Sequence, residues 1–305
     1  MSSLAEMDPV VPDWTGPLIP SGNLRRREIV SRMFTGTATA AAVVAVAMLV
    51  IIIFDVASKG SKVLSWGFVT SNTQGAVGGG IANALLGTAV IVAFASLLAT
   101  PVGILTGLYL SEFAGASSRL GRFLKLALDL LQGLPTIIVG LFVYGLIVVA
   151  QHKQTGFAAA VALSIVILPL IARSSQEVLA LVPGSLRDAA DALGVNRWRA
   201  VFGVILPTAA GGITTGAILA IARAAGETAP LLVCNSVYDP NATQFNIFGH
   251  GVPTVPMYIF QAFQLPGSDP INHVWAAAFV MLLFILLANV GARILVARSR
   301  RKLTG

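Results

Sequence analysis

Six long apolar segments dominate the pattern of hydrophobic and polar positions along the chain. They cover residues 34–54, 83–110, 131–150, 157–171, 208–225 and 274–296. A helix needs roughly 20 residues to cross a hydrocarbon core of about 30 Å, and only the fourth segment is short by this measure. In lipid the backbone must satisfy its own hydrogen bonds, so each segment is predicted to be helical. The pattern therefore predicts an all-α, polytopic transmembrane bundle of about six spans.

The regions outside the apolar segments divide into tails and loops. Residues 1–32 are predicted to be a disordered tail, residues 33–298 the transmembrane domain, and residues 299–305 a basic tail. The inner loop covers 173–207. The outer loop, 228–273, contains an aromatic, amphipathic stretch at 255–263, for which two interpretations stay open: a helix lying at the membrane interface, or a lid packed on the outer helix ends.

Composition supports a membrane protein and argues against several other classes. Charged residues make up 11% of the chain and apolar residues 56%, with a mean hydropathy of +0.83. A soluble domain carries roughly 25% charged residues, so this chain lacks the polar coat that water requires. Cys234 is the only cysteine, which excludes a disulfide framework and a cysteine-rich metal site.

The basic residues predict the orientation of the chain. Most of the 20 Lys and Arg residues lie before the first segment, between the second and third, between the fourth and fifth, and after the last. Positive charge near span ends stays in the cytoplasm, so both termini are predicted to be inside. Because the charge is spread over several loop edges, it forms no single patch for nucleic acid.

The sequence shows no catalytic or nucleotide-binding centre of its own. The phosphate-binding pattern G-x-x-x-x-G-K-[ST] does not occur. A membrane enzyme would need ionisable groups clustered at one depth, and Asp129, Arg223 and Glu227 are the few candidates. We therefore expect a chain that is not an enzyme and holds no cofactor or metal.

The inner loop carries a motif with a long, specific spacing. Asp188–Ala189–Ala190 is followed by Gly194 and, after nine further residues, by Val204–Ile205–Leu206–Pro207. We expect a helix that begins at Asp188, whose charge is favourable in a first turn, and that ends at Gly194. Its alanines would let another protein approach closely, and Pro207 would mark the start of the fifth span. An ordinary polar loop with two surface helices is the alternative.

This spacing resembles the signature of the permease subunits of ABC importers, Glu-Ala-Ala, three residues, Gly, nine residues, then Ile-x-Leu-Pro. Asp188 stands in place of the Glu and Val204 in place of the Ile. The resemblance implies a type I ABC importer permease fold, and an inner loop that couples to a separate ATP-binding subunit. The implied coupling residues are Asp188, Ala189, Ala190, Gly194, Leu206 and Pro207.

An arginine lies near the end of the fifth segment. An arginine inside the membrane costs about 2.5–3.5 kcal/mol on insertion scales and is rarely without a partner or purpose. Arg223 lies sixteen residues after Pro207, about 24 Å along a helix, which places it in the outer half. Glu227 follows on the same helical face. Two interpretations stay open: a guanidinium that meets an anionic substrate, or a structural ion pair.

Three further stretches resemble the PstA-type permeases of bacterial phosphate importers. They are residues 222–232, residues 130–142, and the Gly79–Gly80–Ile81, Asn83–Ala84 and Gly87–Thr88 pattern before and within the second segment. The resemblance implies phosphate as the substrate, with Arg223, Glu227, Thr228 and Gln132 as candidates for the pathway. Gln132 and Pro135 also fit a packing kink. Asp129 is expected to face the cytoplasmic interface.

The resemblance also implies partners and a location. These are an ATP-binding subunit, a second homologous permease, an extracytoplasmic phosphate-binding protein and a bacterial cell membrane. ATP hydrolysis on the partner would drive inward transport by alternating access. Sulfate, molybdate or phosphonate stays open as the substrate. A stand-alone carrier or channel would have no use for the inner-loop motif.

Overall fold

The computed structural model describes residues 24–74, 78–115, 117–236 and 246–303. The chain divides into two compact units, Met1–Phe54 and Asp55–Gly305. Helix α1 (Leu24–Gly60) begins in the first unit and is 37 residues long. Residues 24–32 are therefore helical rather than part of a disordered tail, and the rest of the expected tail lies outside the described residues.

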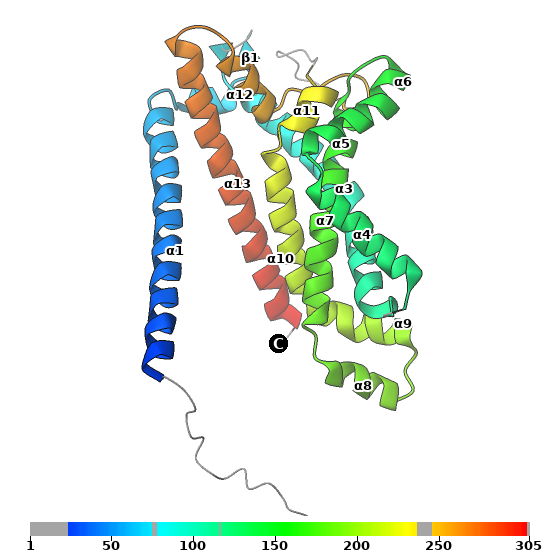
Figure 1. The fold of residues 1–305 in the computed structure, drawn as a ribbon. Helices are drawn as coiled ribbons and strands as arrows, with labels where there is room; N and C mark the ends of the chain where they lie inside the picture. Colours follow the sequence, from blue (N-terminus) through cyan, green and yellow to red (C-terminus); the bar gives the residue numbers. More distant parts are fainter. Residues whose placement is uncertain (1–23, 75–77, 116, 237–245, 304–305) are drawn as a thin grey trace, which may run out of the picture. The chain divides into compact units, whose positions relative to one another are not determined.

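The second unit is built almost entirely of helices (Figure 1). Its long helices are α3 (Ala82–Leu108), α7 (Gly156–Ala180), α10 (Leu206–Ala225) and α13 (Ser268–Leu303). Its other elements are α2 (Trp66–Thr70), α4 (Arg119–Gly133), α5 (Thr136–Val143), α6 (Val149–Gln151), α8 (Gly184–Ala192), α9 (Arg197–Ala200), α11 (Ala229–Cys234), α12 (Val255–Phe263), the π-helical segments η1 (Tyr109–Phe113), η2 (Tyr144–Val148) and η3 (Val201–Ile205), and the antiparallel pair β1 (Thr73–Gln74) and β2 (Gly78–Gly79). The basic tail expected at 299–305 is helical up to Leu303.

Five stretches of the described residues are long and apolar enough to cross a membrane, and a bent pair of helices would make a sixth crossing. The five are Arg26–Gly60, Ala82–Phe113, Gly156–Ala180, Arg197–Ala225 and Ser268–Gly291. The fourth predicted span, 157–171, was therefore too short, because its helix continues through polar residues to Ala180. The count of about six is confirmed when the bent pair is taken as one span.

The third predicted span, 131–150, is not one straight helix. Arg119–Gly133 and Thr136–Gln151 meet at an angle of 104°. Pro135 explains the break, because it has no N–H to donate and it disfavours the helical conformation of the preceding Leu134. Leu134 is extended, with a ψ of 135°. The break that Pro135 predicted in this span is therefore present, and the span is bent at it rather than merely kinked.

Contacts along the chain show in which direction each helix runs. Thr88, near the start of α3, accepts a hydrogen bond from the backbone N–H of Val255 at 2.9 Å. At the start of α7, the N–H of Gly156 donates to the carbonyl of His250 at 3.1 Å. Helices α3 and α7 thus both begin beside the outer segment 250–255, and both end beside α8. They therefore run parallel to one another.

The basic residues identify the end of the unit that carries α8 and α9 as the inner end. The bent pair begins there, beside η1, and finishes at the outer end, where Gln154 donates to the carbonyl of Val233 at 2.9 Å. It therefore joins opposite ends of the unit, as a broken span does.

Small residues form the contact between α3 and α7. Ala95, Ala99, Gly103 and Gly107 recur at every fourth position of α3, and all four are buried. Residues four apart lie on one face of a helix. A Cβ atom added to Gly107 would lie 2.6 Å from the carbonyl oxygen of Ala172 on α7. The two backbones can approach this closely because side chains are nearly absent between them.

The outer end is closed by packed side chains. In α12, Val255, Met257 and Tyr258 are buried. This burial supports the interpretation of α12 as a packed lid and not as a helix lying at the membrane interface. The buried side chain of Asn235 forms two hydrogen bonds with the backbone of Val252, at 2.7 and 2.8 Å. The side-chain nitrogen and oxygen of Asn235 therefore both have a hydrogen-bond partner in the protein and need no water.

The α3–α7 contact gives a prediction for stability. We expect Gly107→Ala to lower the free energy of unfolding by about 1–3 kcal/mol, because the added methyl group would overlap the backbone of α7. The measurement is thermal unfolding of the purified protein in detergent. Gly145→Ala is the control, since a Cβ atom there meets nothing within 4 Å. Equal transition midpoints for the two variants would contradict the close packing.

Candidate functional site

The inner-loop motif folds into the helices expected of it, with one difference. Helix α8 begins at Gly184, one turn before Asp188, and Pro183 precedes it. Asp188 therefore lies in the middle of α8, and the prediction that it begins the helix was wrong. The helix ends at Ala192, and Gly194 has a φ of +67°, the left-handed conformation typical of a residue that ends a helix.

The alanines of the motif divide between two faces of α8. Ala190 is buried against the chain, whereas Ala189 and Ala192 are exposed together with Asp188. Next to them, Leu193 is 81% exposed. One face of α8 thus packs on its own subunit, and the opposite face offers a carboxylate, small residues and a leucine.

The end of the motif leads directly into the fifth span. Helix α9, segment η3 and helix α10 follow one another without a break from Arg197 to Ala225. Pro207 lies at the start of α10 and is exposed, while Leu206 packs against the buried cluster that contains Leu179 and Val201. The π-helical segment ends at Ile205, two residues before this proline, which cannot donate a backbone hydrogen bond.

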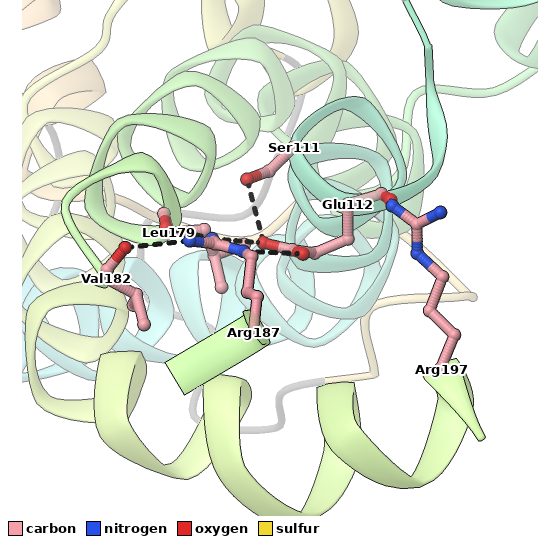
Figure 2. Close-up of polar contacts among 6 residues, drawn as sticks. All are labelled: Ser111, Glu112, Leu179, Val182, Arg187 and Arg197. Carbon is pink, nitrogen blue, oxygen red and sulfur yellow. Dashed lines mark hydrogen bonds and ion pairs between the residues drawn. The ribbon is translucent and has the colours of Figure 1, made fainter. Parts of the chain in front are cut away.

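Sequence reasoning missed the residue that anchors this loop, Glu112. It lies in η1 at the inner end of α3, and its side chain is only 3% exposed. Figure 2 shows the guanidinium of Arg187, from α8, directed at the Glu112 carboxylate, at 2.6 Å. A signal was present in the sequence, because Glu112 is a single acid two residues beyond an apolar segment.

The intramembrane charges form a loose pair. The Nε atom of Arg223 lies 3.8 Å from Glu227 Oε1, and the Arg223 side chain is 65% exposed while that of Glu227 is 17% exposed. Glu227 also accepts a hydrogen bond of 3.4 Å from the hydroxyl of Thr136, at the start of α5. The arginine is therefore open to a further anion, whereas the glutamate connects the end of α10 with the bend of the third span.

The remaining candidate residues lie elsewhere. Thr228 precedes α11, and its carbonyl accepts a hydrogen bond from Leu232. Gln132 donates to the carbonyl of Pro169 in α7 at 3.3 Å, a contact that fits the packing interpretation. Asp129, expected to face the cytoplasmic interface, is exposed and forms an ion pair with Arg173 of α7. Among the described residues, no three His, Cys, Asp or Glu side chains gather around a possible metal site.

Comparison with known proteins places this arrangement in a family. Residues 99–301 match the family described as "Binding-protein-dependent transport system inner membrane component". The phosphate transport system permease protein PstA of Yersinia pestis is 36% identical, over 83% of this chain and 85% of its own length. The phosphate transport system permease protein PstA 1 of Mycobacterium tuberculosis (strain ATCC 25618 / H37Rv) is 34% identical, over 99% of this chain and 98% of its own length.

Solved structures agree on the fold. An inward facing structure of the MetNI methionine ABC transporter matches with a TM-score of 0.57 at 19% identity, covering 72% of this chain and 93% of that chain. A bacterial ABC transporter involved in the import of alginate matches with a TM-score of 0.58 at 14% identity, covering 88% and 98%. The chain therefore belongs to the family of binding-protein-dependent transport system inner membrane components, among the PstA-type permeases, and it is a multi-pass protein of the inner membrane.

Proposed function

We propose that this chain is a transmembrane permease subunit of an ABC importer and that it moves inorganic phosphate into the cell by alternating access. ATP hydrolysis on a separate subunit drives the cycle, so this chain needs no cofactor and no catalytic centre of its own. The observation that carries the proposal is the inner loop, whose helix α8 is anchored to the spans on one face and exposes Asp188 on the other. The similarity of the chain to PstA proteins favours phosphate as the substrate over sulfate, molybdate or phosphonate.

The partners follow from what this chain lacks. A single subunit of six crossings can hardly enclose a gated hydrophilic pathway, so a second, similar permease completes it. The exposed face of α8, with Asp188, Ala189, Ala192 and Leu193, docks on the ATP-binding subunit. A phosphate-binding protein outside the membrane delivers the substrate to the outer end.

Arg223 is the residue of this chain that meets the substrate anion. Its guanidinium is exposed and only loosely held by Glu227, at 3.8 Å. A planar guanidinium can donate two parallel hydrogen bonds to two oxygens of one oxyanion. Phosphate can therefore take the place of Glu227 as the partner of Arg223 without the removal of a tightly bound group.

Replacement of Arg223 tests the pathway. We expect Arg223→Ala to reduce phosphate uptake into membrane vesicles by about 10–100-fold, because hydrogen bonds to charged groups contribute about 1.5–3 kcal/mol. The protein should remain in the membrane, as judged by immunoblot. Arg122→Ala removes an exposed arginine at the inner end and should transport normally. Uptake at the normal rate by Arg223→Ala would exclude this role.

Charge reversal on α8 tests the docking face. We expect Asp188→Arg to abolish the stimulation of the ATPase by the loaded binding protein. A charge of the wrong sign in a protein interface costs several kcal/mol, because it faces charges of its own sign on the partner. The readout is ATP hydrolysis by the purified complex. Asp269→Arg makes the same charge change at the outer end and should leave the stimulation intact. If the Asp188→Arg complex responded normally, Asp188 would have no part in docking.

Competition between oxyanions tests the substrate. The complete complex in proteoliposomes should accumulate labelled phosphate only with ATP on the ATPase side. Sulfate, molybdate and phosphonate in tenfold excess should leave this uptake unchanged. Stronger accumulation of one of these anions than of phosphate would overturn the choice of substrate and leave the importer role in place.

A further inference from the structure

A buried carboxylate lies at the inner end of α3. Glu112 is 3% exposed, and the Arg187 side chain is 30% exposed. The Nη2 atom of Arg187 donates to Glu112 Oε1 at 2.6 Å, and its Nε atom donates to Oε2 at 3.2 Å (Figure 2). The hydroxyl of Ser111 donates to Oε1 at 3.2 Å. This two-pronged arrangement fixes the orientation of the guanidinium as well as neutralising the charge.

The same guanidinium also holds the end of α7. Its Nη2 atom donates to the carbonyl of Leu179 at 3.0 Å, and its Nη1 atom donates to that of Val182 at 2.8 Å. The last carbonyls of a helix lack partners within the helix and attract positive charge. One side chain of α8 therefore connects the inner ends of both parallel spans, α3 and α7.

A second arginine strengthens the connection. Arg197 of α9 donates to the backbone carbonyl of Glu112 (Figure 2). It also lies over the ring of Phe113, 5.4 Å from its centroid. Trp198, also in α9, contacts the same ring at a centroid distance of 4.5 Å. The end of α3 is thus held by both helices of the inner loop, through charge and through aromatic contact.

Electrostatics favours the charged state of Arg187. The hydrogen bond to Glu112 raises the pKa of Arg187 above its ordinary value; burial opposes this, and the charges of Glu112 and Asp188 add to it. Asp188 follows Arg187 in sequence but is exposed. Helix α8 therefore presents a guanidinium to its own subunit and a carboxylate to the outside on neighbouring positions.

We propose that Glu112 and Arg187 form a clamp that makes α8 move as one rigid body with the inner ends of α3 and α7. A displacement of α8 by the ATP-binding subunit would then reach both spans directly. Without the clamp, α8 would be connected to α7 by the short segment 181–183 and to α9 by residues 193–196, and could shift relative to the inner ends of α3 and α7. Both residues are positioning residues, because neither touches the substrate or ATP. Since it concerns coupling to the ATPase, the clamp depends on the proposed function.

The first experiment measures coupling in the complete complex, with its ATPase, second permease and binding protein, in proteoliposomes. The quantity is the amount of phosphate taken up per ATP hydrolysed. We expect Glu112→Gln to lower this ratio about tenfold, within the range typical of coupling between two sites. Arg187→Lys keeps the charge but loses the fork, and should lower it less. Glu177→Gln, an exposed acid near the inner end of α7, should leave the ratio unchanged.

Exchanging the two charges tests whether the ion pair itself is required, or only the individual side chains. The double variant Glu112→Arg with Arg187→Glu restores an ion pair and should recover part of the ratio lost in Glu112→Gln. A normal ratio in Glu112→Gln, in an assembled complex, would overturn the clamp. An equal loss in Glu177→Gln would overturn it too, because the effect would then follow from removing any acid at this end.

The second experiment needs no destabilising variant. Spin labels on Ser185→Cys in α8 and Leu105→Cys in α3, both exposed positions, report the distance between the two helices. The native Cys234 is fully buried and its pKa is raised to about 12 by desolvation, so it should not react with the label. The distance should be the same in the nucleotide-free and ATP-trapped complexes. A shift in the otherwise wild-type complex would overturn the rigid body.

The distance measurement is independent of the transport assignment, whereas the uptake ratio is not. If the wild-type complex hydrolysed ATP but moved no oxyanion, the proposed function would fail. The distance between α8 and α3 would still decide whether the two helices move together.

Discussion

Small residues at every fourth position of α3 let its backbone reach that of α7, and the rest of the transmembrane unit is arranged around this contact. Ala95, Ala99, Gly103 and Gly107 supply the groove, and α10 packs against α7 beside it. In lipid, helices gain little from hiding apolar side chains, so close backbone approach is a main source of attraction. The two parallel helices thereby form a stiff pair whose inner ends lie near one another.

The inner ends of that pair are where the unit meets its surroundings. Arg187 joins both helix ends to α8, and Asp188 lies on the exposed side of the same helix. Such an arrangement suits a subunit that is moved from outside, because a force applied to a short surface helix needs a stiff connection to the membrane. The loose Arg223–Glu227 pair differs from this, as the proposed role of Arg223 in binding and releasing the substrate requires.

Hydropathy and spacing predicted much of this molecule. The apolar segments, their orientation and the helix end at Gly194 all depend on local chemistry, which a sequence carries. The 104° bend was not predicted, although Pro135 was noticed as a break, because hydropathy averages across a proline. The pairing of Glu112 with Arg187 joins residues 75 positions apart, and no local pattern specifies such a partner. The choice between a lid and an interfacial helix likewise depended on tertiary packing.

The surface of the inner loop has a consequence for how the subunit is produced. Leu181 and Leu193 are each 81% exposed and Trp198 is 58% exposed, all at the end of the unit that faces the aqueous cytoplasm. Large apolar side chains in water are a marker of unfinished assembly, which quality-control proteases and chaperones detect. An unassembled copy would display this marker, and an assembled copy would hide it. If the proposed ATP-binding subunit covers this surface, the same side chains would mark for removal the copies that have not assembled.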